Sequence, residues 1–235
     1  MNKFWEELPS GYYDLILKKG LDKNRGIQAN WHNITFLEVR KNIDNTKNHL
    51  DYACGPGTFI GLYDLPNSTG VDISEKQINY ALDKYSNLGD FRVINKEELK
   101  NSKFDVISII GLFEFIDDQE IKNLINFLSQ ILNDDGKILI TTPNYGGFMI
   151  ILEKLLNLFG SINYKNQHIN RLNKKRLLNL LKETEFKKIK IKKFLNLSVF
   201  TSLVNIKLAI KLENYISKLF RNFFGFILLI ELKID

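Results

Sequence analysis

The sequence predicts an α/β fold in which helices cover both faces of a doubly wound, mostly parallel sheet. From residue 48 onward, short strand-type segments alternate with amphipathic helix-type segments. Several strand-type segments, such as FDVISII (104–110), are continuous apolar runs, which is typical of strands that are buried on both faces. A chain of 235 residues is long enough for one such domain and somewhat short for two.

The segments follow one another in a regular order. The first 47 residues are expected to be helical, in LPSGYYDLILKKGL and NWHNITFLEVRKNI. Strands are predicted over residues 49–53, 68–73, 91–95, 104–110, 136–143, 186–194 and 224–233. Helices are predicted over residues 58–65, 74–86, 119–132, 145–160, 174–186 and 204–223. Ser74 is expected to cap the second of these helices, with Gln77 at the capping-box position, and Asp117 or Asp118 to cap the third.

These segments predict a single domain over residues 1–235, because no linker rich in Pro, Gly or Ser divides the chain. Within it we expect an N-terminal helical cap over 1–47 and a ligand-binding core over 48–143. Residues 144–171 and 195–223 are predicted to be helical insertions on that core.

Composition narrows the class of protein. The single cysteine, Cys54, excludes an internal disulfide framework and a zinc site built from cysteines, and it fits a reducing cytoplasm. The N-terminus lacks the unbroken apolar core of a signal peptide, and no stretch approaches the roughly 18–20 apolar residues of a spanning helix. We therefore expect a cytoplasmic protein, with a peripheral position at a membrane surface as the alternative.

The net charge of +6 is unevenly distributed. Residues 1–150 carry 16 Lys and Arg against 21 Asp and Glu, whereas residues 151–235 carry 17 against 6. Nucleic acid, an anionic membrane or an anionic substrate would each explain a basic C-terminal third. Solvated helix faces in a chain rich in Lys and Asn would explain it equally well.

The stretch HLDYACGPGTF (49–59) carries the clearest functional signal. Gly55 and Gly57 directly follow a buried strand and open a helix, so that backbone N–H groups can approach a ligand closely. Asp72 ends the next strand, seventeen residues after Gly55, where a carboxylate can accept hydrogen bonds from a ribose diol. The pattern predicts a nucleoside-type cofactor at the carboxyl edge of the sheet.

Two details separate the possible cofactors. Gly61 falls one position late for the G-x-G-x-x-G fingerprint of nicotinamide cofactors. Asp51 would repel a pyrophosphate by on the order of 1 kcal/mol or more, whereas it would attract an ammonium group. S-adenosylmethionine has an amino group, a ribose and a sulfonium, so it suits this set better than NAD does.

At these residues the sequence resembles the class I S-adenosylmethionine-dependent methyltransferases, and the resemblance extends over most of residues 45–190. LDYACGPGTF is similar to the first motif of that family, and GVDIS, RVINKEEL, FDVISIIGLFEFIDD and GKILITTPN follow with the family's order and spacing. The resemblance implies a Rossmann-like sheet of seven strands whose last strand is antiparallel. It also implies cofactor contacts at Asp51, Ala53, Gly55, Gly57, Asp72, Ile73, Asn95, Lys96, Ile110 and Gly111.

The chain departs from the family after the fourth strand. Many relatives carry Glu-His there, which some O-methyltransferases are thought to use to hold a metal, whereas this chain has Glu114-Phe115. We therefore predict no metal.

The resemblance also suggests where catalysis takes place. His168 lies where relatives often carry a histidine that faces the acceptor, and His32 lies on a helix that the family often folds over the cofactor. These two residues are the predicted catalytic groups, as base or substrate contact, and a base is needed only for a hydroxyl or protonated amine acceptor. Asn144 and Tyr145, just beyond the fifth strand, are the predicted acceptor contacts.

The predicted function is methyl transfer to an O or N atom of a small-molecule, sugar or lipid-linked acceptor. An RNA methyltransferase that uses the basic C-terminal third is the alternative, although no RNA-binding module is recognisable and nucleic acid is the disfavoured partner. A non-catalytic binding or interaction protein with the same fold is the alternative from another class.

The predicted C-terminal helix bears on the choice of partner. Its apolar residues fall at 204, 208, 212, 215, 216, 219, 220 and 223, and Lys207, Lys211, Lys218 and Arg221 occupy other faces. This pattern fits an interfacial helix on anionic lipid, and it also fits a helix packed on the core with a basic face in water. Core packing is the preferred interpretation, and peripheral membrane contact remains the alternative.

Overall fold

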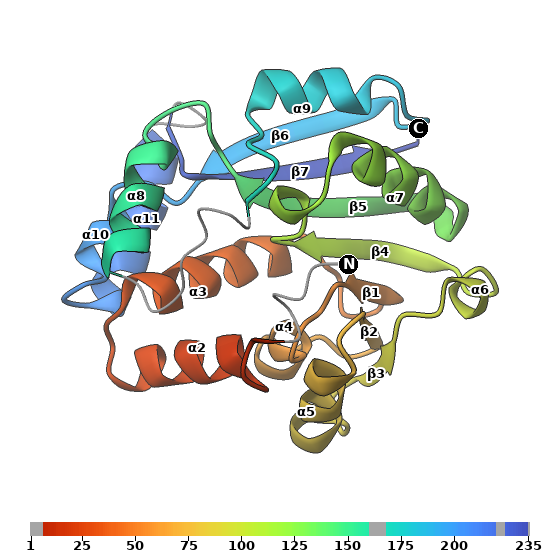
Figure 1. The fold of residues 1–235 in the computed structure, drawn as a ribbon, viewed down its shortest axis with the longest axis horizontal. Helices are drawn as coiled ribbons and strands as arrows, with labels where there is room; N and C mark the ends of the chain where they lie inside the picture. The colour runs from red at the N-terminus through yellow and green to blue at the C-terminus, as the bar shows by residue number, and fades with distance from the viewer. Residues whose placement is uncertain (1–6, 160–167, 220–223, 235) are drawn as a thin grey trace.

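The computed structural model of the chain describes residues 7–159, 168–219 and 224–234. Seven strands form one sheet in the order β3-β2-β1-β4-β5-β7-β6 (Figure 1). The strands are β1 His49–Tyr52, β2 Ser68–Asp72, β3 Asp90–Val93, β4 Phe104–Ile110, β5 Leu132–Pro143, β6 Lys188–Phe194 and β7 Ile227–Lys233. Only β7 runs antiparallel to its neighbours, which confirms the predicted Rossmann-like sheet with an antiparallel last strand.

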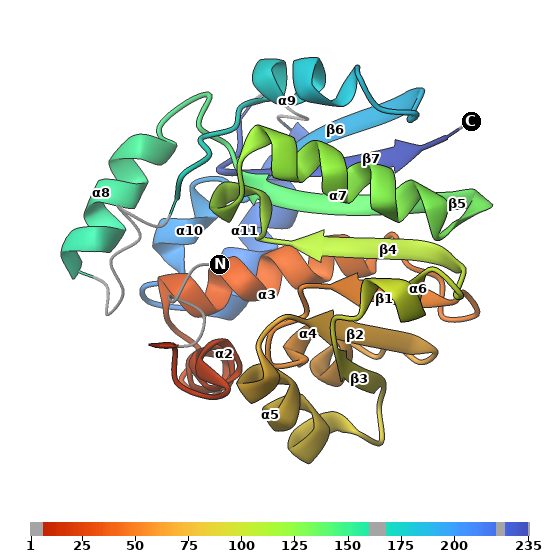
Figure 2. The ribbon, with the colours of Figure 1, turned by 45° about the vertical axis from the view of Figure 1, so that its right-hand side comes forward.

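Helices lie on both faces of this sheet (Figures 1 and 2). They are α2 Tyr12–Asp22, α3 Ile27–Arg40, α4 Thr58–Leu62, α5 Glu75–Tyr85, α6 Lys96–Leu99, α7 Asp118–Gln130, α8 Met149–Phe159, α9 Lys174–Leu181, α10 Ser198–Thr201 and α11 Ile206–Leu219, with a 3-10 turn η1 over Phe113–Phe115. Asp117 caps α7 in a complete capping box with Glu120, as one of the two predicted alternatives.

Alternating residues of a strand pack into two separate hydrophobic cores. Ile138 and Ile140 of β5 pack into the core beneath α7 and α9, whereas Leu139 packs into the core beneath α3 and α8. Such alternation is the period-2 consequence of the pleat, and it explains why apolar residues of the central strands point to both faces of the sheet. The sheet is thereby buried on both faces, and its carboxyl edge is the part that remains open to a ligand.

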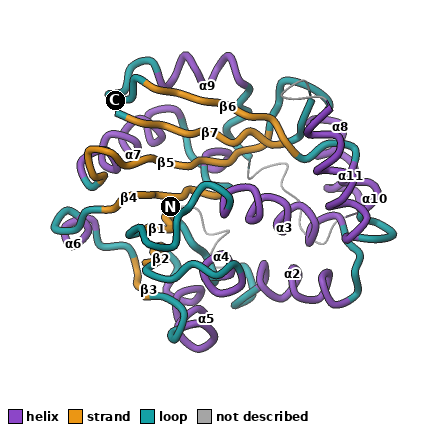
Figure 3. The backbone as a smooth tube through the Cα atoms, turned by 180° about the vertical axis from the view of Figure 1, so that it is seen from behind, coloured by secondary structure: helices purple, strands orange, loops and turns teal. Residues whose placement is uncertain are grey.

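The order of the strands reverses between β1 and β4. Chain connections run outward from β1 to β2 and β3 on one side, and from β4 to β5 on the other. Ligands of open parallel sheets bind beyond the carboxyl ends of the strands at such a switch point. The tube in Figure 3 shows α2 and α3 on the same side of the molecule as α10 and α11, beyond this edge.

Two sequence-based expectations need correction here. Ser74 is the N-cap residue of α5, but its side chain makes no capping hydrogen bond. The Gln77 side chain accepts from the Gly11 N–H at 3.0 Å and donates to the Pro9 carbonyl at 3.2 Å. Tertiary contact with the segment before α2 has therefore replaced the predicted capping box.

The second correction concerns the C-terminal helix. α11 buries Ile206, Ala209 and Glu213. Of the apolar positions expected to pack on the core, Leu212 and Ile216 are partly buried, whereas the others that the structure describes are exposed. Val204 and Tyr215 are 81% and 66% exposed, and Leu208 and Leu219 are exposed as well. Positions 220 and 223 of the predicted stripe, and Arg221, lie outside the described residues.

No helix within the described ranges combines the length and the apolar character that crossing a membrane requires.

Candidate active site

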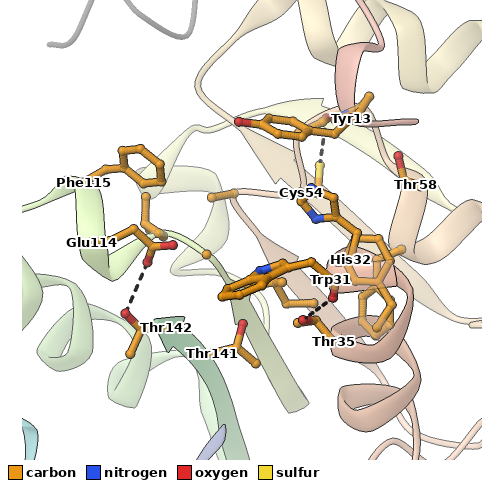
Figure 4. A pocket seen from close by; sticks show the side chains of 18 of the residues that line it. Tyr13, Trp31, His32, Thr35, Cys54, Thr58, Glu114, Phe115, Thr141 and Thr142 are labelled. Atoms are coloured by element: carbon orange, nitrogen blue, oxygen red, sulfur yellow. Dashed lines mark hydrogen bonds between the residues drawn. The ribbon is translucent and has the colours of Figure 1, made fainter. Parts of the chain in front are cut away.

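A cavity of about 260 Å³ opens at the switch point of the sheet (Figure 4). Its floor comes from the ends of β1, β2 and β4, and its cover comes from α3 and the segment before it. Further residues enter from the end of β5 and from the stretch before α9. The pocket is therefore built where the topology places a ligand, from segments that are more than 100 residues apart in the chain.

Asp51 lies at the bottom of this pocket at the end of a buried hydrogen-bond chain. Ser108 Oγ of β4 donates to Asp51 Oδ1 at 2.6 Å. His49 Nε2 lies 2.9 Å from the same hydroxyl, and His49 Nδ1 lies 2.8 Å from Ser68 Oγ. Because an ionised carboxylate only accepts, donation runs in one direction from Ser68 through His49 and Ser108 to Asp51.

Burial determines which side chains of this hydrogen-bonded series are ionised. Burial raises the pKa of Asp51 to about 7, with the Ser108 hydrogen bond opposing the rise and the nearby Asp72 carboxylate adding to it. Burial lowers the pKa of His49 to about 3, so that this imidazole is neutral. The site thus holds a carboxylate at the edge of ionisation, which a cationic ligand would stabilise in its charged form.

The two glycines of the loop have different roles. Gly55 has a φ of 55° and no atom within 4 Å of the position that a Cβ would take, so the backbone is open toward the pocket. Gly57 has a φ of 72°, and a Cβ there would lie 2.6 Å from Phe91 and 2.8 Å from Ala81. Gly57 does not line the pocket. Its positive φ and its close packing account for a glycine at this position, and the cofactor contact predicted for Gly57 stays a prediction.

Asp72 holds the neighbouring backbone in place. Its Oδ2 accepts from the Gly55 N–H at 2.8 Å and its Oδ1 accepts from the Ser74 N–H at 2.9 Å. Ile73 follows as a partly exposed apolar wall, and Ala53, Ile110 and Gly111 line the pocket as predicted contacts.

Two buried hydroxyls give an independent indication that a polar ligand belongs in the pocket. Thr58 Oγ1 and Ser74 Oγ both lack a hydrogen-bond partner among the described residues. Both residues line the cavity, next to the Gly55 loop and Asp72. Buried hydroxyls without partners are costly, so their presence here fits a nucleoside-type group with polar atoms at this end.

Asn95 and Lys96 do not line the pocket, and their predicted contact with an adenine stays a prediction. The exposed Asn95 side chain caps α6, where its Oδ1 accepts from the Glu97 N–H at 3.1 Å. The Lys96 ammonium lies 5.5 Å above the Phe127 ring. The local preference of asparagine for a helix cap accounts for its position.

Glu114 lies at the other end of the pocket, between the ends of β4 and β5. Its Oε2 accepts from Thr142 Oγ1 at 3.3 Å, and its Oε1 lies 3.5 Å from the position that a Cβ on Gly111 would take (Figure 4). Burial raises the pKa of Glu114 to about 7, against the opposing hydrogen bonds from its own backbone N–H and from Thr142. A carboxyl group tuned to neutrality in a cleft is a candidate acid or base.

His168 lines the same end of the pocket, and neighbouring side chains hold its imidazole in place. Its Nδ1 lies 2.9 Å from Tyr145 Oη, and the Tyr145 hydroxyl donates to Glu153 Oε2 at 2.7 Å. Phe115 meets the imidazole edge-on, with ring centroids 5.0 Å apart. Burial lowers the pKa of His168 to about 4, although Glu153 acts in the opposite direction. His168 is therefore neutral at pH 7.

The predicted acceptor contacts Asn144 and Tyr145 lie behind the pocket wall and do not line it. The buried Asn144 side chain donates to the Gly225 carbonyl at 2.8 Å and accepts from the Gly146 N–H at 3.2 Å. Tyr145 contacts His168 as described. Both side chains have structural partners where the chain reverses after β5, and the acceptor contacts predicted for them stay a prediction.

Helix α3 places aromatic side chains over the cavity (Figure 4). His32 lines the pocket and packs edge-on against Tyr13 of α2, with ring centroids 5.2 Å apart. Burial lowers the pKa of His32 to about 4. Trp31 and Thr35 of the same helix also line the pocket, and Thr35 Oγ1 donates to the Trp31 carbonyl at 2.7 Å.

A model of the methyltransferase domain matches residues 24–191, which is well over half of the chain. The chain belongs to this methyltransferase domain family. The match spans the glycine loop, both pocket carboxylates and Glu114.

Two curated relatives are similar to parts of this chain. An uncharacterized protein of Methanocaldococcus jannaschii is 28% identical over 185 residues, covering 77% of this chain and 67% of the relative. The tRNA (guanine-N(7)-)-methyltransferase of Clostridium botulinum strain 657 is 30% identical over 114 residues, covering 46% of this chain and 48% of the relative. This chain thus spans about half of the tRNA enzyme.

Solved structures of other methyltransferases share the fold. A SAM-dependent methyltransferase of Thermotoga maritima, described as a possible histamine N-methyltransferase, superimposes with a TM-score of 0.63 at 17% identity, over 86% of this chain and 88% of that one. Magnesium protoporphyrin IX methyltransferase of Synechocystis, solved with bound SAH, superimposes with a TM-score of 0.57 at 15% identity, over 88% of this chain and 85% of that one.

Within this methyltransferase domain, the described residues contain no group of three or more His, Cys, Asp or Glu side chains that could hold a metal ion. That the protein binds no metal stays a prediction. Cys54 is buried, and burial raises the pKa of its thiol well above the usual value, which is typical of an inert core thiol.

Sequence reasoning missed several lining residues of this methyltransferase domain. It noted Glu114 only as a departure from a metal motif, and it passed over Trp31, Thr35, Thr58, Thr142 and Ser74. The raised pKa of Glu114 depends on burial, which a single sequence does not reveal. The signal that was available is its place, directly after the fourth strand at the edge where ligands bind.

Proposed function

We propose that this chain transfers the methyl group of S-adenosylmethionine to an O or N atom of a small, partly apolar acceptor. The single observation that carries the proposal is one continuous cavity with two unlike ends. Asp51 and Asp72 line the cofactor end, and Glu114 and His168 line the other. Membership of the methyltransferase domain family supports the reaction class.

The cofactor end has groups for each polar part of S-adenosylmethionine. Asp51 would attract the ammonium group, and Asp72 would accept from the ribose hydroxyls. The partnerless Thr58 and Ser74 hydroxyls are available for the remaining polar atoms. When bound, S-adenosylmethionine supplies a methyl group that its sulfonium makes electrophilic.

The acceptor end combines apolar walls with polar groups. Trp31, Phe115 and Met149 line it alongside Thr141 and Thr142. This lining suits an acceptor with an aromatic or aliphatic portion and one hydroxyl or amine near Glu114. A lipid-linked acceptor, or a sugar carried on an apolar group, satisfies the same requirement.

The chain's own residues contribute positioning, exclusion of water and removal of a proton. Positioning two reactants in line can lower a barrier by several kcal/mol, so no further activation of the methyl group is needed. Glu114, with a pKa of about 7, is ionised in part of the molecules at neutral pH and takes the proton from an acceptor hydroxyl or ammonium.

His168 orients the acceptor in this proposal. Because Tyr145 gives its hydroxyl proton to Glu153, it accepts from Nδ1–H of His168, which assigns the lone pair to Nε2. The imidazole lines the pocket, so it can contact a part of the acceptor other than the group that gives its proton to Glu114. A pKa of about 4 makes His168 a weaker base than Glu114, so the acceptor contact is the role it fits better.

RNA methylation is the second candidate, favoured by the partial identity with a tRNA methyltransferase. Incubation with radiolabelled S-adenosylmethionine and either bulk tRNA or an organic extract of lipids and small molecules would separate the two. Label in the extract, lost in Glu114→Gln, supports the proposal. Label in tRNA alone would overturn the acceptor class but not the reaction.

Binding without turnover in every acceptor pool, with S-adenosylhomocysteine never formed, would favour a non-catalytic protein of the same fold. No binding of S-adenosylmethionine would overturn the cofactor assignment itself.

A further inference from the structure

The outward face of α11 carries two parallel stripes of side chains. Lys207, Lys211 and Lys218 form one stripe, with spacings of four and seven residues. Leu208, Tyr215 and Leu219 form the other, with spacings of seven and four, and Val204 lies in the turn just before the helix. Such spacings keep each set on one side of a helix, and all seven residues are exposed.

The inward face fixes this orientation. The buried Glu213 carboxylate accepts from the backbone N–H groups of Leu195 and Asn196, both at 2.9 Å, and from the hydroxyls of Ser198 and Ser217. Glu213 is also the only acidic residue of α11. Rotation of the helix would break these bonds, so the lysines and the apolar residues are held outward together.

Neighbouring segments extend the same surface. Leu197, Phe200 and Leu203 are exposed in and beside α10. The α2–α3 connection packs against the start of α11, because Asn24 accepts from the Ile206 N–H at 2.8 Å through its carbonyl and from the Lys207 N–H at 3.1 Å through its side chain.

This connection adds positive charge beside the apolar residues. Lys19, Lys23 and Arg25 border a shallow hollow whose rim includes Leu203. None of these three, nor the three α11 lysines, forms an ion pair within the part of the chain that the structure describes. The charge of the surface is therefore not neutralised from within.

We propose that the α10–α11 surface docks the protein on an anionic membrane. It consists of the apolar residues Leu197, Phe200, Leu203, Val204, Leu208, Tyr215 and Leu219 and the cations Lys19, Lys23, Arg25, Lys207, Lys211 and Lys218. The apolar stripe enters the acyl boundary, and the lysines beside it reach the phosphate groups.

The chemistry of the surface favours lipid over other partners. Nucleic acid binding draws on cations, and RNA readers add stacking platforms, whereas five of the seven apolar residues of this surface are aliphatic and only Phe200 and Tyr215 are aromatic. A protein partner would be expected at a surface with both charge signs, but α11 exposes no acid. Each cation near an anionic surface contributes roughly a fivefold gain in partitioning.

The surface adjoins the catalytic pocket across the first turn of α3. Ile27 and Gln28 line both the pocket and the hollow bordered by Lys19 and Arg25. Docking would bring the pocket close to the lipid headgroups, which suits a lipid-linked acceptor. That link to the acceptor rests on the proposed function, whereas docking does not, because vesicle binding needs no turnover.

The test is flotation of the full chain with vesicles of phosphatidylcholine alone or with about one third phosphatidylglycerol. The test variant is Leu208→Ser with Lys211→Gln, which removes one residue from each stripe. The matched control is Leu82→Ser with Lys84→Gln on α5, which are also exposed and lie far from α11 (Figure 1). Circular dichroism and S-adenosylmethionine binding report whether each variant is folded.

We expect the wild type to float with anionic vesicles only, the test variant to partition at least tenfold less, and the control to be unchanged. The proposal is overturned if the wild type does not float, or if the two variants behave alike. It is also overturned if Leu208→Ser alone has no effect, since binding would then be non-specific charge attraction. Binding of tRNA but not of vesicles, lost in the test variant, would assign the surface to nucleic acid instead.

Discussion

Ser108 Oγ donates a 2.6 Å hydrogen bond to Asp51 Oδ1 from the neighbouring strand, and this bond opposes the burial that raises the pKa of Asp51. The parallel register pairs the two residues directly. His49 backs the serine hydroxyl and is itself kept neutral by burial. The sheet thus carries a built-in support for one carboxylate whose charge the proposed cofactor would stabilise.

The affinity for S-adenosylmethionine is expected to fall as the pH drops below about 7. Asp51, whose pKa is about 7, is ionised above that pH and attracts an ammonium group, whereas below it the carboxyl group is neutral. Ser108→Ala removes the opposing hydrogen bond, so the midpoint should move to higher pH. Titration calorimetry across pH 5.5–8.5 checks this, and an affinity that is flat in pH would refute it.

Asp51→Asn is expected to weaken cofactor binding while stabilising the free protein at pH 8. A carboxyl group whose pKa is raised on folding stabilises the folded state below about pH 4, and this contribution is lost as the pH rises through about 7. Asparagine never carries the charge and can still accept from Ser108. Thermal unfolding should show a melting temperature higher by a few degrees at pH 8, with little gain at pH 4.5.

Replacing the two loop glycines by alanine is expected to have different effects, on stability in one case and on cofactor affinity in the other. Gly57→Ala places a Cβ within 2.6 Å of Phe91 at a φ of 72°, and it should cost roughly 1–3 kcal/mol of stability. Gly55→Ala meets no atom within 4 Å, so its main effect should be a loss of cofactor affinity, with a smaller cost from its own positive φ. Chemical denaturation and cofactor titration on the same two variants distinguish the effects; equal losses of stability would contradict the assignment.

Glu114→Gln is expected to lower kcat by 100-fold or more for a hydroxyl or ammonium acceptor, with cofactor affinity nearly unchanged, because it removes the proposed proton acceptor. In the wild type, activity should rise with pH through about 7. Tyr145→Phe, which releases the support of His168, should instead raise the KM for the acceptor. If Glu114→Gln keeps full activity and the same pH profile, the base lies elsewhere.

The fold and the cofactor loop could be predicted from sequence because both depend on local signals. Continuous apolar strands, alternating helices and the spacing from Gly55 to Asp72 are all visible in one chain. The residues of the acceptor side could not be predicted from the sequence, because they depend on which side chains are buried together. Asn144 and Tyr145 follow β5 as expected, but their side chains bond to Gly225 and Glu153 and do not line the cavity.

The orientation of α11 shows the same difficulty. Apolar periodicity alone favours an inward apolar stripe, but the polar Glu213 is the residue that finds five hydrogen-bond donors inside. A buried carboxylate with that many partners outweighs the burial of one more leucine. The preferred interpretation, an apolar stripe packed on the core, is therefore corrected at the exposed positions 208, 215 and 219, because a buried polar residue sets the orientation of the helix.

The account depends most on S-adenosylmethionine occupying the pocket through Asp51 and Asp72, and calorimetric titration tests this directly. The wild type should bind S-adenosylmethionine and S-adenosylhomocysteine with micromolar affinity and NAD not at all, and Asp72→Ala should weaken both by tenfold or more. Absence of binding by the folded wild type, tight binding of NAD, or unchanged affinity in Asp72→Ala would contradict it.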